Sequence, residues 1–481
     1  MLFNSLNFAI FLPLVFFLYW FAVKKDRFLQ NCLLLVASYL FYAFWDWRFL
    51  SLLAFSTLLD FYTGSKIADA TGSGRKKWLW LSIIVNLGFL GVFKYYDFFA
   101  ESFAEALLHF GLEVDPWTLK LVLPVGISFY TFHGLSYVFD IYNGRIRPEK
   151  NLVDYSLFVS FFPLLVAGPI ERATHLLPQL KNARVFDYSK AADGLRQILW
   201  GLFKKIVIAD NCAQFANLAF DEPGNYSGST LIVGAVFFAF QIYADFSGYS
   251  DIALGTARLF GIELLRNFSF PYFSRDIAEF WRRWHISLSS WFRDYLYIPL
   301  SGSRGSTLIK IRNVFIIFIL SGFWHGSNWT FIVWGALNAI YFLPLLLWNK
   351  NRLNTDIAAQ GKILPSLKEA SGILLTFGLT LIAWVVFRSE SLTQACEYFS
   401  YTFSTSLFSI PDFYGAGSML FISVTLGIFI AIEWFGREQK YALEVFGSGW
   451  GRVVRWSFYY TLIFFIYYYG GQPQQFIYFQ F

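Results

Sequence analysis

Long apolar runs recur along almost the whole of this 481-residue chain. Runs of about 18 to 22 residues have the length at which an α-helix crosses the hydrocarbon core of a bilayer. Only 15% of the residues are charged, whereas soluble domains carry roughly 25%. The pattern therefore predicts an all-α polytopic membrane protein. The clear runs lie near 6–23, 29–45, 48–64, 78–96, 118–139, 192–218, 229–249, 370–387, 417–434 and 454–470.

Two further apolar regions are irregular. The run at 153–168 contains Pro163, and both of its flanks are basic, which favours a re-entrant segment that leaves and returns on one side. The run at 311–348 is interrupted near His325. It predicts either a full helical hairpin or two re-entrant halves that meet near that histidine. We expect about 10 to 12 spans in all, with re-entrant and interfacial helices in addition.

Basic residues orient the spans. Clusters such as Lys24–Arg27 and Arg75–Lys77 belong in the cytoplasm by the positive-inside rule. This arrangement places both termini on the outer face. The run at 6–23 lacks a basic start and a small-residue cleavage site, so we expect a retained span rather than a signal peptide. No internal repeat or low-complexity linker divides the chain, which predicts a single domain over 1–481.

Charge and cysteine usage exclude several classes of function. The net charge of +6 is small and indicates no nucleic-acid partner. The three cysteines lie far apart, so they indicate neither a disulfide framework nor a metal site. A nucleophile elbow, a P-loop, a dinucleotide fingerprint and a zinc motif are all absent from the sequence. We therefore expect no bound metal and no resident cofactor.

His325 is the first candidate catalytic residue. It lies in the segment FIIFILSGFWHGSNWTFIVW, where mostly apolar residues flank it for about ten positions on each side. An ionisable side chain deep in an apolar run is costly and marks a functional candidate by default. The small residues Gly322 and Gly326 allow a ligand or backbone to approach closely. The alternative is a histidine that only packs against a neighbouring helix.

His285 is the second candidate and lies in the segment EFWRRWHISLSSWFRD. Helical spacing would place its tryptophans on one aromatic stripe, with Arg282, Arg283 and Arg293 off that stripe. One interpretation is an interfacial helix with tryptophan anchors and snorkelling arginines. The other is that His285 faces inward while the three arginines bind phosphates of an anionic donor.

The remaining polar candidates in apolar runs are weaker. His133 lies beside Gly134 in a span and could line a cavity or satisfy a helix contact. His109 and His175 belong to charged stretches, which favours solvated side chains. The carboxylates of Asp245 and Asp251, near the end of a span, are expected to pair with interface arginines.

The segments 281–300 (WRRWHISLSSWFRDYLYIPL) and 321–326 (SGFWHG) together resemble the membrane-bound O-acyltransferase (MBOAT) family. The likeness extends over nearly the whole chain. In particular, the chain is similar to members that O-acetylate exported polysaccharides such as alginate. His133 is a departure, because close relatives are expected to carry glutamine there. Further matching segments are LPVGISFYTF at 123–132, VAGPIER at 166–172, YADFSGYSDIA at 243–253 and the terminal FIYFQF at 476–481.

The resemblance implies a helical ring around a central tunnel, with the core signature at about 120–350 and additional C-terminal spans at about 370–472. It implies that His325 is the catalytic histidine near the membrane centre and that His285 is the second signature residue. The reaction would move an acyl group from a cytoplasmic thioester, acetyl-coenzyme A or another acyl thioester, to a hydroxyl. A buried neutral imidazole can remove the proton of such a hydroxyl.

The resemblance further implies a bacterial inner membrane protein that passes the acyl group to a periplasmic acyltransferase or esterase-like partner. The exported polysaccharide would then be acylated indirectly. Alternatives within the family are D-alanyl transfer and peptidoglycan O-acyl transfer. An alternative from a different class is a polytopic transporter, because broken helices at mid-membrane also occur there. The basic, tryptophan-rich segment 281–312 favours a donor-binding enzyme over a transporter.

Overall fold

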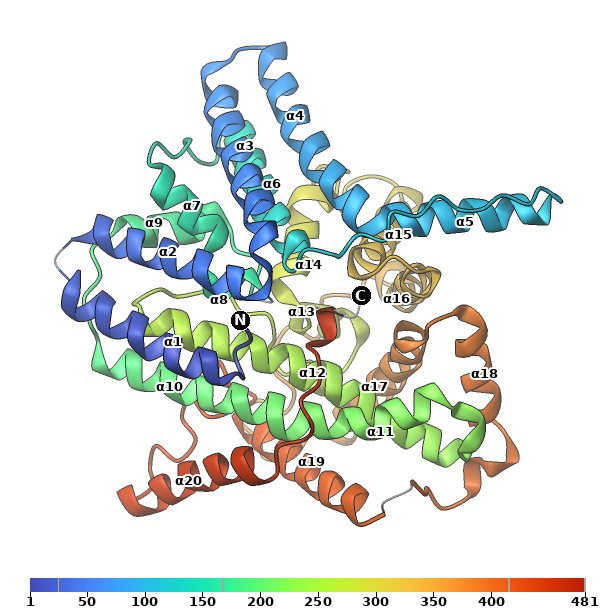
Figure 1. Ribbon diagram of the computed structural model, residues 1–481. Coiled ribbons are helices and arrows are strands. Elements are labelled where there is room, and N and C mark those ends of the chain that lie inside the picture. The colour runs from blue at the N-terminus through green and yellow to red at the C-terminus, as the bar shows by residue number, and fades with distance from the viewer. Residues whose placement is uncertain (25, 167, 414–415, 480–481) are drawn as a thin grey trace. The chain divides into compact units, whose positions relative to one another are not determined.

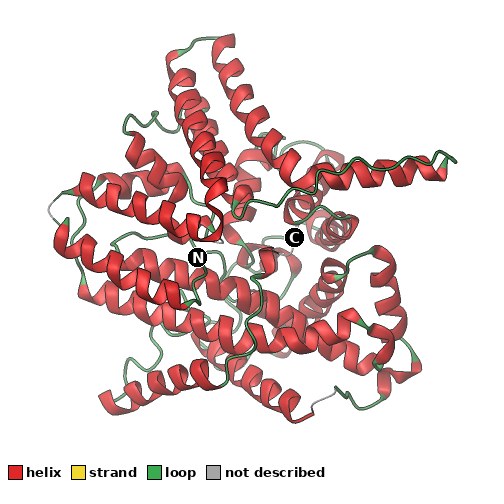
Figure 2. Cartoon of the chain, viewed as in Figure 1, coloured by secondary structure: helices red, strands yellow, loops and turns green. Residues whose placement is uncertain are grey.

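The computed structural model describes residues 1–24, 26–166, 168–413 and 416–479, and over these ranges it contains helices and loops without a strand (Figures 1 and 2). Lys25, Ala167, Gln480 and Phe481, which belong to the basic cluster and motifs above, lie outside the described residues. The α-helices are α1 Leu6–Phe17, α2 Arg27–Asp46, α3 Leu50–Asp69, α4 Ser73–Leu90, α5 Tyr96–His109, α6 Ile127–Tyr142, α7 Leu152–Ser160, α8 Phe162–Leu165, α9 Ala173–Lys181, α10 Tyr188–Phe203, α11 Asp210–Asp221, α12 Gly228–Leu259, α13 Ile277–Arg283, α14 Ile286–Phe292, α15 Thr307–His325, α16 Trp329–Leu347, α17 Leu367–Arg388, α18 Leu392–Thr402, α19 Ala416–Gly436 and α20 Arg452–Tyr468.

Seven helical stretches within the described ranges are long and apolar enough to cross a membrane. This confirms the prediction of an all-α polytopic membrane protein. A further apolar helix, Leu6–Ala22, is shorter. The seven stretches are Arg27–Asp69, Ser73–His109, Gly228–Leu259, Thr307–His325, Trp329–Leu347, Leu367–Arg388 and Met419–Gly436.

The chain forms two compact units. Unit 1 comprises residues 1–191 and 256–265, and unit 2 comprises residues 192–255 and 266–481. The helix α12 contributes most of its length to unit 2 and its last residues to unit 1. That one functional domain covers 1–481 remains a prediction from the sequence.

A buried carboxylate joins three helices of unit 1. Asp60 on α3 accepts hydrogen bonds from the Ser82 hydroxyl of α4 at 2.6 Å and from the Asn86 amide at 2.8 Å. A side chain at Gly134 on α6 would collide with the same carboxylate, so glycine there allows α6 to approach α3. Because buried polar groups need partners, these contacts fix the register of α3, α4 and α6.

In unit 1, two of the predicted apolar runs contain helices that are shorter than the runs themselves. The run at 153–168 divides into α7 and α8, of 9 and 4 residues. At about 1.5 Å per residue neither can cross a bilayer, which agrees with a re-entrant segment. The run at 118–139 is helical only from Ile127, because the backbone N–H groups of Leu119 and Lys120 bind Asp97 instead of a helical carbonyl.

The interrupted region 311–348 is a full helical hairpin in unit 2. Its two helices, α15 and α16, have 19 residues each. A Cβ atom at Gly322 would collide with the Phe331 carbonyl, and one at Gly335 would collide with the Phe318 carbonyl. The two glycines therefore permit the close helix contact that places His325 at the turn of the hairpin.

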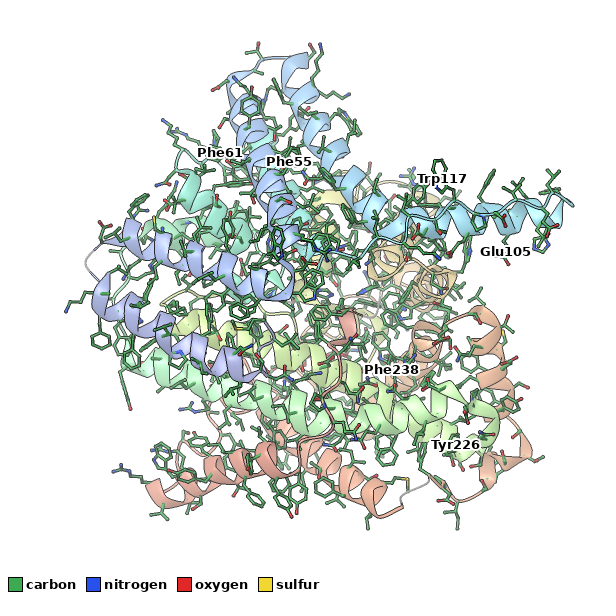
Figure 3. The ribbon with its side chains drawn as sticks, in the orientation of Figure 1. Phe55, Phe61, Glu105, Trp117, Tyr226 and Phe238 are labelled. Carbon is green, nitrogen blue, oxygen red and sulfur yellow. The ribbon has the colours of Figure 1, made fainter. Side chains whose placement is uncertain are left out.

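Aromatic side chains both fill and coat the helices (Figure 3). Phe238 of α12 is fully buried in the core of unit 2. Phe55 of α3 and Trp117, which follows α5, are exposed instead. Exposed large apolar side chains on many helices are expected where the surrounding solvent is lipid.

Candidate active site

His285 lies where the expected aromatic helix is broken. The helix α13 ends at Arg283, and α14 begins at Ile286. His285 itself adopts a left-handed backbone conformation with φ 43° and ψ 55°. Such a conformation costs roughly 1–3 kcal/mol in a non-glycine residue and concentrates at functional sites. The break turns the His285 side chain into the protein, so the interpretation of one continuous interfacial helix is wrong for this segment.

Backbone contacts hold this strained residue in place. The N–H of Ile286 donates to the Asn267 carbonyl at 2.8 Å. The Asn267 side chain accepts from the Ser287 hydroxyl at 2.6 Å and donates to Ser250 on α12 at 3.0 Å. These bonds fasten the start of α14 to α12, so the two residues that follow His285 are fixed in place.

His325 is the last residue of α15. Gly326 follows it in an extended conformation, and a Cβ atom there would collide with the ring of Phe331. The helix therefore stops where its C-terminal side chain enters the core of unit 2. The small residue that follows His325 therefore lets the turn of the hairpin pack closely against the Phe331 ring.

The structure brings the two predicted histidines together. The ring centroids of His285 and His325 lie 6.1 Å apart. The side chains are 1% and 3% exposed, respectively. Neither ring nitrogen of His285 has a hydrogen-bond partner among the residues that the structure describes. A buried polar group without a partner in the protein is positioned to bind a ligand.

Aromatic rings enclose the histidine pair. Phe246 of α12 meets the His285 ring edge-on at 4.7 Å, and Trp324 lies 5.7 Å from it. Trp334 and Phe387 stand edge-on to the His325 ring at 5.3 and 5.6 Å. Such a lining excludes water, which would otherwise compete with any bound hydroxyl.

Burial governs the protonation of His285. Desolvation, together with the neighbouring His325, lowers the pKa of His285 well below its usual value of 6.5. The imidazole is therefore neutral at neutral pH. A neutral imidazole can accept a proton, whereas an imidazolium cannot.

Tyr478 completes the enclosure from the far end of the chain. Its ring lies 5.7 Å from the His325 ring and 6.2 Å from the His285 ring. The sequence showed the terminal motif only as part of the family likeness and did not place it in the site. The one available signal was a run of aromatic residues after the last span, at 476–479.

A buried ion cluster fixes the segment that carries Tyr478. Lys205, in the π-helical stretch between α10 and α11, pairs with Asp210 and Asp245 at 2.8 Å each. It also donates to the Gln474 carbonyl, and the Asp245 carboxylate accepts from the backbone N–H of Ile477. Figure 1 shows this C-terminal segment in red, running away from α20 across α11. The cluster therefore holds the segment that places the Tyr478 ring beside the two histidine rings.

The two span carboxylates have lysine partners rather than the expected arginines. Asp245 pairs with Lys205, and Asp251 pairs with Lys204 at 2.9 Å. Lys204 also lies 3.3 Å from Glu433 of α19. The expectation of arginine partners was wrong because both lysines come from the π-helical stretch after α10, which sequence spacing does not bring near α12.

The predicted donor-binding arginines lie in other surroundings. The guanidinium of Arg283 binds Glu279 at 2.8 Å and the carbonyl of Asp356. Arg282 donates to backbone carbonyls of the loop at 351–354. Arg293 is exposed and pairs with its neighbour Asp294. Donor binding by these three arginines remains a prediction.

The other histidines belong to unit 1. His133 is buried, and its Nε2 accepts from the backbone N–H of Glu171. His175 is half-buried and bonds the Glu171 carboxylate at 2.8 Å, while His109 is exposed at the end of α5. Within the described ranges, histidines, cysteines and carboxylates form no group of three that could hold a metal ion.

The chain matches known proteins over most of its length. Residues 145–368 match the model of the membrane-bound O-acyltransferase family. The chain is 38% identical to the probable alginate O-acetylase AlgI of Azotobacter vinelandii over 453 residues, which is 93% of this chain and 87% of the relative.

Two further relatives are similarly close. The probable alginate O-acetylase AlgI of Pseudomonas aeruginosa is 39% identical over 446 residues, covering 92% of this chain and 82% of the relative. The peptidoglycan O-acetyltransferase of Helicobacter pylori is 38% identical over 428 residues, covering 82% and 79%. With this likeness over most of its length, the chain belongs to the membrane-bound O-acyltransferase family and is a polytopic O-acyltransferase.

Proposed function

We propose that this enzyme moves an acetyl group from a cytoplasmic thioester toward an exported polysaccharide such as alginate, with His325 as the general base. The observation that supports the chemistry most directly is the pair of buried histidine rings 6.1 Å apart. The relatives named alginate O-acetylase support the acceptor class, because they match over 92–93% of this chain.

The reaction balances with the groups at this site. A neutral His325 takes the proton of the acceptor hydroxyl as its oxygen attacks the thioester carbon. The tetrahedral intermediate then collapses, the C–S bond breaks and the thiolate leaves. The imidazolium returns its proton to the sulfur, so an ester and a thiol are formed. General-base assistance of this kind contributes roughly 10²- to 10⁴-fold to the rate.

His285 has a second role in the proposal. Its ring nitrogens have no partner among the described residues, and the ring lies beside that of His325. A neutral imidazole N–H at this position can donate a hydrogen bond to the oxyanion of the intermediate. His285 would therefore stabilise charge while His325 moves the proton.

Peptidoglycan is a second candidate acceptor. The Helicobacter pylori relative named peptidoglycan O-acetyltransferase is as similar as the alginate relatives, at 38% identity. Both acceptors are polysaccharides with hydroxyl groups outside the cytoplasmic membrane. The same histidine chemistry serves either one, so the acceptor is decided by the partner and the polymer that the cell exports.

The membrane arrangement follows from the proposed route. The donor would be acetyl-coenzyme A or another acyl thioester from the cytoplasm. A periplasmic acyltransferase or esterase-like partner would receive the group and place it on the polymer. The chain would lie in the bacterial inner membrane with both termini in the periplasm, as the basic loops predict.

Cells that lack this gene test the proposal when they are complemented with wild type, His325→Ala or His109→Ala. The measured quantity is the O-acetyl content of each exported polysaccharide. We expect wild type and His109→Ala to restore acetylation and His325→Ala to fail at equal protein level. His109 is a matched control because it is an exposed histidine on α5. Unchanged acetylation with His325→Ala would refute the proposed base.

A further inference from the structure

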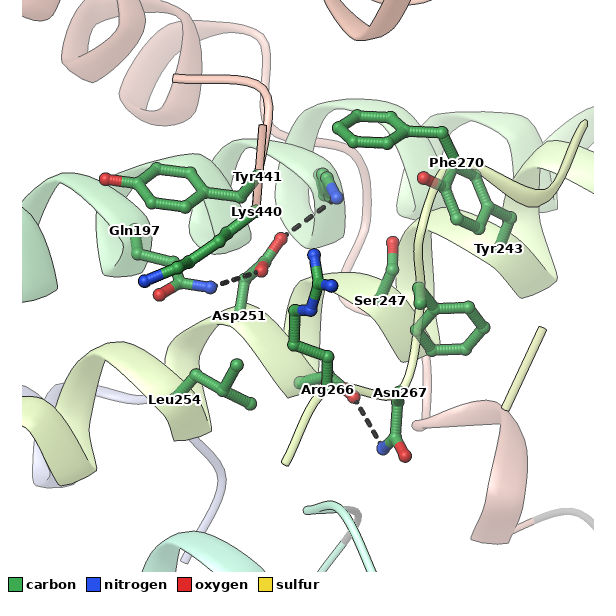
Figure 4. A pocket seen from close by; sticks show the side chains of 13 residues that line it. Gln197, Tyr243, Ser247, Asp251, Leu254, Arg266, Asn267, Phe270, Lys440 and Tyr441 are labelled. Carbon is green, nitrogen blue, oxygen red and sulfur yellow. Dashed lines mark hydrogen bonds and ion pairs between the residues drawn. The ribbon is translucent and has the colours of Figure 1, made fainter. Parts of the chain in front are cut away.

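A small polar pocket lies inside unit 2 (Figure 4). It holds about 370 Å³ of empty space, part of it open to solvent. Its walls come from α10, α12, the segment at 266–270 and the loop that carries Lys440 and Tyr441. This pocket belongs to none of the histidine contacts described above.

The charges around the pocket favour an anion. Three cations line it, namely Lys204, Arg266 and Lys440, against the single carboxylate of Asp251. That carboxylate is already bound by Lys204 at 2.9 Å and by the Gln197 amide at 2.8 Å. The two remaining cations therefore determine the sign of the field inside the pocket.

Arg266 is the cation best placed for a ligand. Arg266 is an exposed residue, and its guanidinium lies in the pocket between Asp251 and Ser247 (Figure 4). No ion pair of Arg266 is found in the part of the chain that the structure describes. Lys440 is exposed and has only a distant pairing with Glu444 at 3.8 Å. A planar guanidinium in this state is suited to a phosphate group.

Buried polar atoms provide an independent indication of a ligand. The Ser247 hydroxyl and the Gln197 side-chain carbonyl have no hydrogen-bond partner among the described residues. The two side chains are 2% and 1% exposed. Both residues line the pocket, and the Ser247 hydroxyl is directed into it (Figure 4). Leaving such groups unsatisfied is costly, so a bound molecule is expected to complete them.

The pocket shares a wall with the histidine site. Asn267 lines the pocket and also holds Ile286 and Ser287, which directly follow His285. Phe268 lines the pocket and packs 4.9 Å from the Phe246 ring that covers His285. A ligand whose anionic end occupies the pocket is thus held one layer of side chains from the reacting groups.

We propose that this pocket binds the phosphate ester of a pantetheine thioester, with Arg266 and Ser247 as its principal contacts. The inference rests on the proposed use of a thioester donor. The 4′-phosphopantetheine group is common to coenzyme A and to acyl-carrier proteins, so the shared chemistry is a phosphate on a pantetheine arm. Arg266 and Lys440 come from two loops whose basic residues predict a cytoplasmic location, which is the side of the donor.

Arg282 and Arg283 fit this role less well. Their guanidinium groups bind the loop at 351–356, and Arg283 also binds the buried carboxylate of Glu279. A phosphate at either arginine would have to displace these bonds. A phosphate that binds Arg266 in the pocket displaces no such bond.

Binding measurements with purified full-length protein test the pocket without any need for turnover. The probes are 4′-phosphopantetheine and pantetheine, which differ by the phosphate alone. Wild type should bind the phosphorylated probe at least about 10-fold more tightly. Arg266→Gln should abolish that preference, and Ser247→Ala should reduce it. Arg452→Gln is the matched control, since Arg452 is an exposed arginine at the start of α20, and it should keep the preference.

Equal affinity of wild type for the two probes would overturn the proposal, as would a phosphate preference unchanged in Arg266→Gln. Such a result, together with intact acetyl transfer, would leave the proposed function standing. Loss of acetyl transfer with an intact phosphate preference would instead refute the proposed function and leave the pocket proposal standing. A second pair of probes, coenzyme A and a carrier protein bearing phosphopantetheine, distinguishes the two sources of the phosphopantetheine group. The one that is the true donor should bind Arg266→Gln more weakly than wild type. If neither loses affinity, the pocket is not the donor site.

Discussion

The rings of His285 and His325 lie side by side in unit 2 with 6.1 Å between their centroids, although His285 comes from the break between α13 and α14 and His325 from the end of α15. A group held between two such rings can hydrogen-bond to both, because each hydrogen bond spans roughly 3 Å between heavy atoms. Deprotonation of a hydroxyl and stabilisation of an oxyanion can therefore occur at one place. The other features of the site hold this pair in position.

Tyr478→Ala should lower kcat for acetyl transfer by about 10-fold or more, because it opens the aromatic wall to water. The Tyr478 ring lies against both imidazoles, at 5.7 and 6.2 Å. The matched control is Tyr467→Ala, which removes an exposed tyrosine of α20 and should leave kcat unchanged. Equal rates for the two variants would mean that the C-terminal segment does not enclose the site.

Lys205→Met should destabilise the protein by about 3–5 kcal/mol, because it leaves two buried carboxylates without their cation. Those carboxylates belong to Asp210 and Asp245, each 2.8 Å from the lysine. Thermal unfolding in detergent measures the change. Lys368→Met, at an exposed lysine of α17, serves as the control and should shift the midpoint little. A Lys205→Met midpoint no lower than that of the control would contradict the cluster's anchoring role.

Gly322→Ala should destabilise unit 2 by about 1–3 kcal/mol and reduce activity, because the added methyl group collides with the Phe331 carbonyl. The collision separates α15 from α16 and displaces His325 at their turn. Gly427→Ala in α19 adds the same methyl group where no atom lies within 4 Å. That variant should be as stable as wild type or slightly more stable. Equal unfolding midpoints for both variants would argue against the close contact.

His175 should make the stability of unit 1 depend on pH. Its hydrogen bond to Glu171 raises the pKa of His175 above 6.5, with the Glu263 charge acting in the same direction and burial opposing it. A raised folded-state pKa adds stability that is fully present below about pH 6.5 and is lost as the pH rises through the folded value. His175→Asn should therefore lower the unfolding midpoint more at about pH 5.5 than at about pH 8.5. A loss that is equal at both pH values would exclude the charged pair.

Much of the fold follows from the sequence because bilayer thickness sets the length of each apolar run. The hairpin of α15 and α16 was one of two predicted alternatives, and its glycines decide between them. His325 was identifiable as a polar residue isolated in such a run. The start of α6 at Ile127 was not, because the preceding backbone binds Asp97 from a distant segment.

The rest of the site depends on contacts between distant segments. Local pattern predicts a continuous helix through His285, whereas the bond from Ile286 to Asn267 breaks it. Tyr478 enters the site because Lys205 and Asp245 bind the segment before it. Contacts between residues that lie far apart in the sequence leave no periodic pattern in it, so they can be identified only in the folded structure.

The single-turnover rate of acetyl transfer from bound donor, measured in wild type, His325→Ala and His285→Ala, shows whether His325 is the base. We expect a fall of about 10²-fold or more in His325→Ala with donor affinity unchanged, because the base is lost while the donor pocket remains. We expect a smaller fall in His285→Ala. A His325→Ala rate equal to that of wild type would contradict the assignment of His325 as the base.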